Sequence, residues 1–351
     1  MKITRTKYGR GFTYHYEDGS RLQDNSEKDK REKQWIKSLA IPPAWTEVEI
    51  DLDRRAKVLA SGRDDAGKKQ YIYNPDWRAK RNHKKFARIQ RFAKQLPEMR
   101  RKTTQQIDQW LTKYQANDNN TTNDRPVALD RETVLACMVR LLDTAYFRPG
   151  NDKYTRDNES YGLTTLRTKH LKIEDDELVF EYRGKSGVEQ VKSVKDEQLA
   201  CIIRELDDTP GYRIFKYFDG NQKVYVNSDD LNDYIKSVMG ESFSAKDFRT
   251  WAGTAVAALA LTEFDITDNQ TERDKNMLTA IEKVAKRLGN SPSICRENYI
   301  DPRILDAYID GQTIRNLRDN ISQELEDQYL SADEYATLKL LEARLDHESA
   351  E

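Results

Sequence analysis

The sequence is poor in cysteine, and the positions of its cysteines exclude two kinds of site. Cys137, Cys201 and Cys295 are the only three in 351 residues, and they lie far apart. An odd and widely spaced set provides neither a disulfide framework nor the close spacing of metal ligands. We therefore expect three free thiols in a reducing compartment.

Long apolar runs are also missing. No stretch approaches the roughly 20 apolar residues that a membrane-spanning helix needs. The N-terminal segment MKITRTKYGRGF is basic but has no apolar region behind it, so it does not resemble a signal peptide. We expect a cytosolic protein without a membrane contact, and charged residues at 34% of the chain indicate a strongly hydrated surface.

The net charge of −1 conceals a strong asymmetry along the chain. Residues 63–102 carry fourteen Lys and Arg against four Asp and Glu, whereas residues 311–351 carry four against ten. A basic body with an acidic tail favours a polyanionic partner such as a nucleic acid. The alternative is a solvated helix face, although the basic run has few oppositely charged partners at i,i+4 spacing.

The N-terminal part of the chain is typical of short strands followed by a helix. Residues 46–52, 57–60 and 69–73 are predicted strands with turn residues between them. Asp76 is a suitable N-cap for a helix that runs towards Leu96. Apolar residues at helical spacing would form its buried stripe, namely Phe86, Ile89, Phe92, Ala93 and Leu96.

The rest of the chain predicts helices and one small sheet. The polar segment at residues 116–126 is a loop or linker by composition. A helix from Asp130 should end near Arg148-Pro149-Gly150, because Pro and Gly do not continue a helix. Three further strands are predicted at residues 168–173, 178–182 and 189–194.

Further patterns mark helix ends in the second half. Ser244 with Asp247 resembles a capping box, and Ser291-Pro292 places an N-cap before a first-turn proline. The acidic tail from Gly311 is expected to be helical and solvated. The sequence therefore predicts an α+β fold, with a small β-rich N-terminal domain and a larger, mostly α-helical domain that contains a small antiparallel sheet.

Four residues form a candidate set for chemistry on phosphate. Arg148 follows a predicted helix, Lys185 lies in the glycine-flanked turn YRGKSG, Arg249 lies in a first helical turn, and Tyr299 follows a helix start. Arginines can bind nonbridging oxygens and stabilise transition-state charge. A tyrosine can attack phosphorus while a lysine protonates the leaving oxygen, so this set can transfer a phosphoryl group without metal.

The motifs that contain these residues are more specific than the single residues. In chain order they are YFRPGNDKY, FEYRGKSG, KDFRTWAGT and GNSPSICRENYIDP. In order and spacing they resemble the catalytic motifs of type IB DNA topoisomerases, most closely the bacterial branch related to the poxvirus enzymes. The stretch IPPAWTEVEIDLDRRAKVLASGRDDAGKKQYIYNPDW resembles the same family, so the resemblance extends from about Tyr8 to about Asp310.

The resemblance implies a role for each matched position. The family's two arginines fall on Arg148 and Arg249, its leaving-group lysine on Lys185 and its nucleophile on Tyr299. The fifth catalytic position is commonly His, and here it is Asn290. An amide can donate to a nonbridging phosphate oxygen but cannot become cationic. The alternative is that Asn290 only caps the preceding helix.

The reaction implied by the resemblance is relaxation of supercoiled duplex DNA. Tyr299 would form a 3′-phosphotyrosyl bond while Lys185, helped by Arg148, protonates the leaving 5′-oxygen. The cut strand would swivel, and the 5′-hydroxyl would reseal it. We expect no cofactor, because the bond energy stays in the phosphotyrosine and no carboxylate cluster suggests a Mg²⁺ site.

The resemblance also implies the domain organisation of a monomer that clamps duplex DNA. It places a β-rich DNA-binding domain at residues 1–77, a catalytic domain at 78–310 and an acidic, helical C-terminal tail at 311–351. The polar segment at residues 116–126 suggests a different boundary. We prefer the first, because loops rich in Asn and Asp also occur inside domains.

Several residues are predicted to contact DNA. Tyr71 and Tyr73 alternate within a strand and would share one sheet face, although core packing is the alternative. Basic residues that follow would bind phosphates, and Tyr154 of the first catalytic motif joins them; the full set is Tyr71, Tyr73, Arg78, Lys80, Arg81, Lys84, Lys85 and Tyr154. His83 and His170 are expected at the surface or near DNA, without metal-ligand company.

Two other functions use similar residues. A tyrosine recombinase shares the Arg, Lys, Arg and Tyr chemistry, but its second motif is usually His-x-x-Arg, whereas Lys246 stands at that position here. A noncatalytic DNA-binding protein could use the same basic surface. The complete catalytic set argues against this second alternative.

Overall fold

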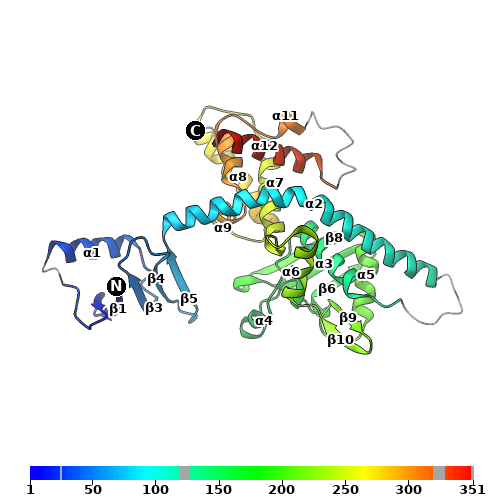
Figure 1. Cartoon of the computed structure of the whole chain (residues 1–351), viewed down its shortest axis with the longest axis horizontal. Helices are drawn as coiled ribbons and strands as arrows, with labels where there is room; N and C mark the ends of the chain where they lie inside the picture. Colours follow the sequence, from blue (N-terminus) through cyan, green and yellow to red (C-terminus); the bar gives the residue numbers. More distant parts are fainter. Residues whose placement is uncertain (24–25, 119–126, 319–328, 349–351) are drawn as a thin grey trace. The chain divides into compact units, whose positions relative to one another are not determined.

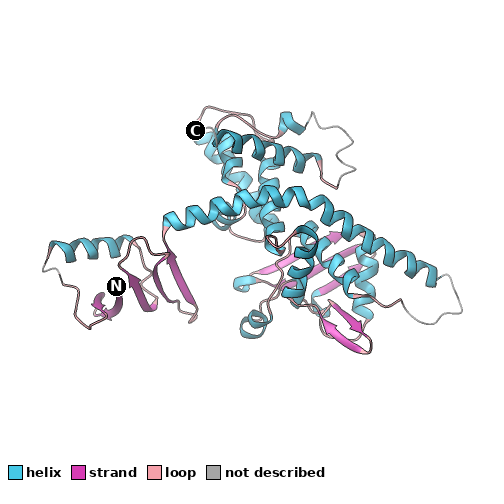
Figure 2. Ribbon diagram, in the orientation of Figure 1, coloured by secondary structure: helices cyan, strands magenta, loops and turns pink. Residues whose placement is uncertain are grey.

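A computed structural model describes residues 1–23, 26–118, 127–318 and 329–348 (Figure 1). The chain divides into two compact units, Met1–Phe86 and Ala87–Glu351. Strands dominate the first unit and helices the second, whose strands form small sheets (Figure 2). The α+β prediction is confirmed, and the predicted boundaries at 77/78 and 310/311 stay predictions.

The first unit is built on an antiparallel sheet with the strand order β2-β1-β3-β4-β5. Its elements are β1 (Lys2–Tyr8), β2 (Gly11–Tyr16), α1 (Glu27–Ser38), β3 (Thr46–Asp51), β4 (Val58–Arg63) and β5 (Lys69–Tyr73). Ile3, Val48 and Ile50 of the sheet are buried together with Ile36 of α1. Helix α1 therefore supplies the apolar partner that one sheet face needs.

The sequence predicts β3, β4 and β5 to within a few residues, but not β1 and β2. Only Ile3 of β1 and Thr13 of β2 are buried, so neither strand shows a clear apolar alternation. Strand β1 is fixed by its pairing with β3, in which Ile3 lies opposite Ile50. A local pattern cannot reveal such a long-range pairing.

Helix α2 (Pro75–Asp118) starts earlier and runs much further than predicted. The prediction of Asp76 as N-cap is wrong, because Asn74 Oδ1 accepts the Asp76 amide at 2.9 Å and the helix begins at Pro75. Pro97 does not end the helix. Residues buried on both sides of Pro97 offset its lost hydrogen bond, including Phe92, Leu96, Met99, Ile107 and Trp110. Residues 116–118 of the predicted linker are helical, and 119–126 lie outside the described residues.

The second unit contains the remaining helices and two small sheets. The N-cap at Asp130 is confirmed, since its side chain accepts the Thr133 amide at 2.7 Å. Helix α3 (Arg131–Ala145) ends in left-handed backbone at Tyr146, slightly earlier than predicted. Next come α4 (Asp152–Asn158), the 3₁₀ turns η1 (Leu163–Thr165) and η2 (Thr168–His170), the sheet β6 (Leu171–Glu174), β7 (Glu177–Arg183) and β8 (Glu189–Lys195) with turn η3 (Lys185–Gly187), α5 (Glu197–Asp208), β9 (Lys216–Asp219) and β10 (Gln222–Tyr225).

The predicted sheet is confirmed as an antiparallel sheet of order β6-β7-β8. The strand predicted at residues 168–173 is partly wrong, because residues 168–170 form a 3₁₀ turn and only the later part pairs with β7. The β7–β8 pair is a hairpin, and Lys185 lies in its connecting turn.

Helices complete the second unit. They are α6 (Ser228–Met239), α7 (Ala245–Leu261), α8 (Gln270–Leu288), α9 (Pro292–Asn298), α10 (Pro302–Ile309), α11 (Arg315–Arg318) and α12 (Ala332–Glu348). The capping box of Ser244 with Asp247 and the N-cap at Ser291 are confirmed. Helix α7 is buried along most of its length, and Phe248 packs edge-on against Phe92 of α2.

The acidic tail is helical in α11 and α12, as predicted, but α12 is not solvated. Ala336, Leu338 and Leu341 are buried, and α12 packs against α7 and α10. Because α12 covers apolar surface of α7 and α10, it belongs to the core of the second unit.

Candidate active site

Helix α7 holds Tyr299 closely. Tyr299 ends α9, and its carbonyl accepts the Thr254 hydroxyl at 3.3 Å. A Cβ added to Gly253 would lie 2.6 Å from the same carbonyl oxygen, so only glycine allows this approach. The Arg249 guanidinium lies 5.1 Å from the centroid of the Tyr299 ring. Two predicted site residues therefore meet on one face of α7.

Arg249 is buried, and not all of its N–H donors are used in hydrogen bonds within the described part of the protein. It is 2% exposed, and its Nη atoms donate to the carbonyl of Tyr146 and to that of Leu288, the latter at 2.8 Å. Burial lowers the pKa of Arg249, and the charge of Arg148 lowers it further. Within the described residues, Arg249 Nε is buried without a hydrogen-bond partner. An unsatisfied buried donor of this kind suits an anionic ligand.

Arg148 reaches the end of α8 from the loop after α3. Its Nη2 donates to the Gly289 carbonyl at 3.3 Å and to Asn290 Oδ1. The structure thus brings together four predicted site residues, Arg148, Arg249, Asn290 and Tyr299. The first and the last of them are more than a hundred residues apart in the sequence. The two arginines lie close enough for the charge of Arg148 to act on Arg249.

Asn290 does not cap α8 with its side chain. Gly289 takes the left-handed position with φ +61°, and the amides of Gly289 and Asn290 both donate to the Ala285 carbonyl. The Asn290 Oδ1 is instead held by Arg148, while its Nδ2 is buried with no partner in the described part of the chain. This geometry favours the predicted site role, in which Nδ2 donates to a phosphate oxygen.

The cations around Tyr299 ease its ionisation. Burial raises the pKa of the phenol, but the positive charges of Arg249, Arg148 and Lys246 outweigh burial and leave the pKa below its ordinary value. A phenol that loses its proton more readily is a better nucleophile at neutral pH.

Lys185 lies at the exposed tip of the β7–β8 hairpin. The next residue, Ser186, has φ +64° and Gly187 has φ +75°, so the turn is tight and left-handed. No hydrogen bond or ion pair joins Lys185 to another described residue. An exposed lysine on a hairpin can approach a bound substrate.

Two cations near the site were not among the predicted site residues, although Lys246 lies in one of the quoted motifs. Lys192 of β8 is half-buried, its Nζ donates to the Arg287 carbonyl at 2.8 Å, and burial followed by the charges of Arg249 and Arg148 lowers its pKa to about 8. Lys246 is exposed at the start of α7 and acts on Tyr299 through its charge. Only the fold brings Lys192 to α8, so no local pattern could have identified it.

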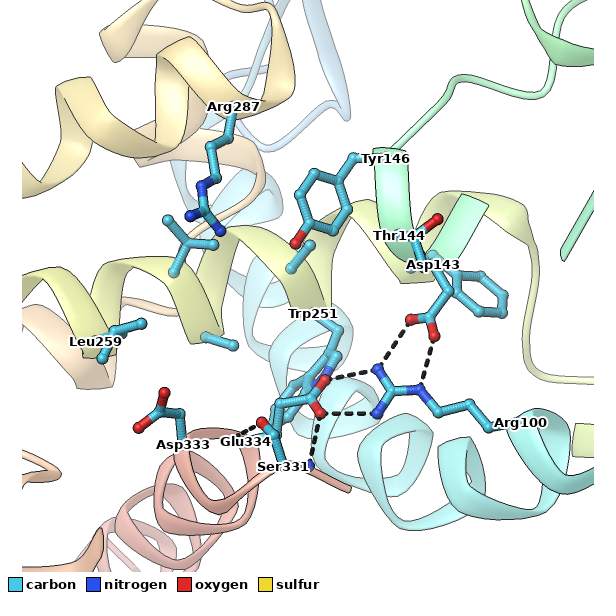
Figure 3. Close-up of a pocket in the computed structure, with 14 residues that line it drawn as sticks. Arg100, Asp143, Thr144, Tyr146, Trp251, Leu259, Arg287, Ser331, Asp333 and Glu334 are labelled. Carbon is cyan, nitrogen blue, oxygen red and sulfur yellow. Dashed lines mark hydrogen bonds and ion pairs between the residues drawn. The ribbon is translucent and has the colours of Figure 1, made fainter. Parts of the chain in front are cut away.

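A cavity of about 530 Å³ lies along a different face of α7, lined by Trp251, Ala255 and Leu259 among others (Figure 3). Arg100 crosses one side of it, between Asp143 and Glu334. The candidate catalytic residues do not line the cavity. Two residues that do line it, Tyr146 and Arg287, accept hydrogen bonds from Arg249 and Lys192 through their carbonyls.

The first unit carries a surface of aromatic and basic residues. The rings of Tyr71 and Tyr73 lie 5.8 Å apart, which places them on one face of β5 as predicted, and Tyr73 stacks on Trp77 at 5.1 Å. Lys57 and Arg81 lie over the Trp77 ring. Tyr71 is 44% exposed, so core packing does not account for it.

The other predicted DNA contacts are mostly accessible. Exposed side chains are those of Arg78, Lys80, Arg81, Lys84 and Tyr154, and Lys85 is half-buried. His83 is exposed, but the surface position predicted for His170 is wrong. His170 packs edge-on against Tyr161, and its Nδ1 accepts the Arg167 amide at 3.1 Å.

No group of three or more His, Cys, Asp or Glu is placed to hold a metal ion in the described ranges. No helix among the residues that the structure covers is long and apolar enough to cross a membrane.

Comparison with known proteins identifies two matching families. Residues 74–328 match the family described as "Eukaryotic DNA topoisomerase I, catalytic core", and residues 11–64 match "Bacterial DNA topoisomerase IB, N-terminal domain". The DNA topoisomerase 1B of Acanthamoeba polyphaga mimivirus is 31% identical over 314 residues, which cover 87% of each chain. The DNA topoisomerase I of Monkeypox virus and the DNA topoisomerase 1B of Vaccinia virus (strain Copenhagen) are 26% identical over 333 residues, 90% of this chain and 95% of theirs.

The first family match covers most of the chain and includes all five candidate catalytic residues. The second covers much of the β-rich unit. Together with the mimivirus relative, these matches show that the chain belongs to the type IB DNA topoisomerase family and is an isomerase that acts on DNA.

Proposed function

We propose that the enzyme relaxes supercoiled duplex DNA by transient cleavage of one strand through a 3′-phosphotyrosyl intermediate, without ATP or metal. The observation that carries the proposal is the environment of Tyr299. Arg249 lies over its ring, the charge of Arg148 acts on its phenol, and Arg148 in turn donates to Asn290 just after α8. Arg249 Nε and Asn290 Nδ2 are buried donors that have no hydrogen-bond partner among the described residues, and such donors suit a phosphate in this position.

Cleavage is a transesterification. Tyr299 Oη loses its proton to water and forms a bond to phosphorus, while the bond from phosphorus to the 5′-oxygen breaks. Arg148, Arg249 and Asn290 donate hydrogen bonds to the nonbridging oxygens and stabilise the charge of the pentacoordinate transition state. Lys185, helped by Arg148, gives a proton to the leaving 5′-oxygen.

Resealing reverses these steps after the cut strand has swivelled. The 5′-hydroxyl returns its proton to Lys185 and attacks phosphorus, and Tyr299 leaves. One phosphodiester replaces another in each direction, so the phosphotyrosyl bond keeps the energy that resealing needs. Cationic side chains stabilise the developing charge, which is why we propose that neither ATP nor a metal ion is required.

Binding of duplex DNA is proposed for both units. In the first unit, Tyr71, Tyr73 and the basic residues of α2 would contact the backbone, because phosphate contacts position a protein without reading sequence. In the second, Tyr154 lies on α4, 61% exposed. That the two units clamp the duplex stays a prediction.

We further propose that the enzyme acts as a monomer in the bacterial cytosol, on the DNA of the nucleoid. Arg148, Lys185, Arg249 and Tyr299 all come from one unit of one chain, so the chemistry needs no second copy. Sedimentation of the active enzyme on its own tests the monomer.

A plasmid-relaxation assay separates this proposal from its alternatives. With excess EDTA and no nucleotide, the enzyme should relax supercoiled plasmid that carries no paired sites. The Tyr299→Phe variant should bind DNA and fold normally but neither relax it nor form a covalent adduct. A recombinase would require paired sites, and a noncatalytic protein would only shift the plasmid in a gel. An absolute requirement for Mg²⁺ or ATP would contradict the mechanism.

A further inference from the structure

The C-terminal end of α8 collects three cationic side chains from three different elements. Its last carbonyls have no partner within the helix. The Arg287 carbonyl accepts Lys192 Nζ at 2.8 Å, that of Leu288 accepts Arg249 Nη2 at 2.8 Å, and that of Gly289 accepts Arg148 Nη2 at 3.3 Å. Three consecutive carbonyls therefore fix one cation each.

The carbonyl end of α8 stabilises three cations that would otherwise repel one another. Three positive groups that lie close together repel one another, and burial in addition disfavours their charges. The C-terminus of a helix carries partial negative charge, and hydrogen bonds from ionised donors to carbonyls are stronger than neutral ones. The end of α8 can thus hold cations at spacings that they would not keep by themselves.

Arg148 and Arg249 belong to the catalytic set, but Lys192 has no place in the mechanism above. It lies on β8, opposite Phe180 of β7, in the hairpin whose turn carries Lys185. One face of the hairpin is fixed in the core, where Phe180 and Tyr182 pack against Phe147. The opposite face and the turn are accessible, with Val191 68% and Val188 53% exposed.

Two side chains of β8 contact the end of α8. Lys192 donates to the Arg287 carbonyl, and Gln190, 5% exposed, packs against Gly289. A Cβ on Gly289 would lie 2.1 Å from Gln190 Oε1, so this contact is close. Gln190 supplies packing and Lys192 a charged hydrogen bond between the hairpin and the helix that holds both arginines.

We propose that Lys192 is a positioning residue, whose ammonium ties the β7–β8 hairpin to the carbonyl end of α8 and so places Lys185 against the leaving oxygen. The inference rests on the proposed function, because it assigns a partner to its leaving-group acid. Lys192 acts through Lys185 and donates to the backbone, whereas the catalytic residues contact the phosphate. A misplacement of about 1 Å can cost about 10²-fold in rate, so a single tether has a measurable effect.

The test compares leaving groups in single-turnover cleavage by the full-length enzyme. The substrates are duplexes with a cleavage site mapped for the wild-type enzyme, carrying either oxygen or sulfur at the 5′-bridging position. A thiolate leaves without the proton that an alkoxide needs, because a thiol is far more acidic than an alcohol. Lys192→Met keeps the length of the side chain but removes the donor, and should slow the oxygen substrate about 10²-fold. It should leave the sulfur substrate near the wild-type rate.

A double-mutant cycle and three further variants test whether Lys192 acts through Lys185. Lys185→Met with Lys192→Met should cleave no more slowly than Lys185→Met alone, since both changes remove one function. Lys192→Arg should keep most of the activity. Lys195→Met, on the same strand but exposed and paired with Asp176 at 3.6 Å, is the matched control and should equal the wild type. If Lys192→Met does not fold, the same comparison is made with Lys192→Gln, which keeps a neutral donor.

Three outcomes would overturn the assignment of Lys192. They are equal slowing on both substrates, additive effects in the cycle, and a folded Lys192→Met enzyme that cleaves the oxygen substrate at the wild-type rate. A wild-type enzyme that forms no covalent adduct with either substrate would instead refute the proposed function. The two failures are therefore distinguishable.

Discussion

Asn290 is one of the proposed catalytic residues, and its geometry favours one neutral hydrogen bond to substrate. Arg148 holds its Oδ1, and its Nδ2 has no partner among the described residues. A preorganised bond to a transition-state oxygen contributes roughly 2.7–4 kcal/mol, or about 10²–10³ in rate. Asn290→Ala should slow cleavage and religation by about that factor, because both directions pass through the same transition state. Single-turnover rates in each direction measure it.

The melting temperature of the same variant is the control. Backbone amides already cap α8, so Asn290→Ala should melt close to the wild type. Asn290→His should keep or raise the rate. A destabilised Ala variant with a normal cleavage rate would remove Asn290 from the active site.

Gly253 is the second residue whose replacement should act on the chemistry. In an ordinary helix interior, Ala is more stable than Gly by roughly 0.5–1 kcal/mol. Here the added methyl would collide with the Tyr299 carbonyl at 2.6 Å, so the nucleophile must shift. We expect Gly253→Ala to lower the single-turnover cleavage rate about 10²-fold. Ala255→Ser, on the face of α7 that lines the cavity, should be normal; a fully active Gly253→Ala enzyme would show that Tyr299 is not held in this way.

The contrast between these residues shows what a sequence can reveal about a site. Arg148, Lys185, Arg249, Asn290 and Tyr299 are identifiable because each lies in a motif that resembles a known family. Gly253 and Lys192 act through contacts with distant parts of the chain, to the Tyr299 backbone and to α8. Such contacts exist only after folding, so no spacing in the sequence predicts them.

At the scale of elements, the start of α2 is the main proposed DNA contact of the first unit. Each phosphate contact adds a slope of about −0.9 to the dependence of log affinity on log salt. Replacing Arg78, Lys80, Arg81, Lys84 and Lys85 with Gln should therefore flatten the salt dependence of binding. The cleavage rate at saturating enzyme should stay near normal, since none of them belongs to the catalytic set.

Gln at Lys28 and Lys37, two exposed lysines of α1, provides a control in the same unit that removes two positive charges instead of five. That variant should keep the wild-type slope, as measured by titration at several salt concentrations. An unchanged slope in the α2 variant would show that its basic residues form only a solvated face.

Helix α12 is expected to stabilise the second unit through one buried ion pair. Glu334 accepts from Arg100 of α2 and, at 3.0 Å, from Trp251 Nε1 of α7 (Figure 3). Burial raises the pKa of Glu334, but Arg100 outweighs burial and leaves that pKa below its ordinary value. Because the folded pKa is lowered, the stabilisation is present above pH 4.5 and is lost as the pH falls below it.

Glu334→Gln should lower the free energy of unfolding at pH 7 by about 3 kcal/mol, because it leaves part of the Arg100 charge uncompensated. Urea denaturation measures this change. Asp333→Asn removes the more exposed pair with Arg318 and should cost no more than about 1 kcal/mol. Equal effects of the two changes would show that α12 is not fixed by its buried pair.

The elements that the sequence predicts are those with local signals. Asp130, Ser244 and Ser291 are confirmed as caps because a cap depends on residues within one turn. The length of α2 and the burial of α12 depend instead on tertiary packing. Apolar contacts on both sides of Pro97 keep α2 continuous, and α7 and α10 cover the apolar face of α12.

At the scale of the whole molecule, basic and acidic residues are concentrated in different parts of the chain. The basic run from residue 63 spans β5 and the first half of α2, while the acidic C-terminal segment contains α12, which packs behind α7. A net charge of −1 therefore gives no indication of the polyanion that the enzyme acts on. The charge distribution, and not the total, predicted a nucleic acid.

The proposed function depends above all on one step, in which Tyr299 becomes covalently joined to the 3′-phosphate of a cleaved strand. Trapping the cleaved complex on a labelled duplex, digesting the protein and identifying the modified peptide by mass spectrometry tests it directly. We expect a nucleotide on the peptide that contains Tyr299, a free 5′-hydroxyl on the other fragment, and adduct formation in excess EDTA. An adduct on any other residue, or a link to the 5′-phosphate, would contradict the proposed mechanism.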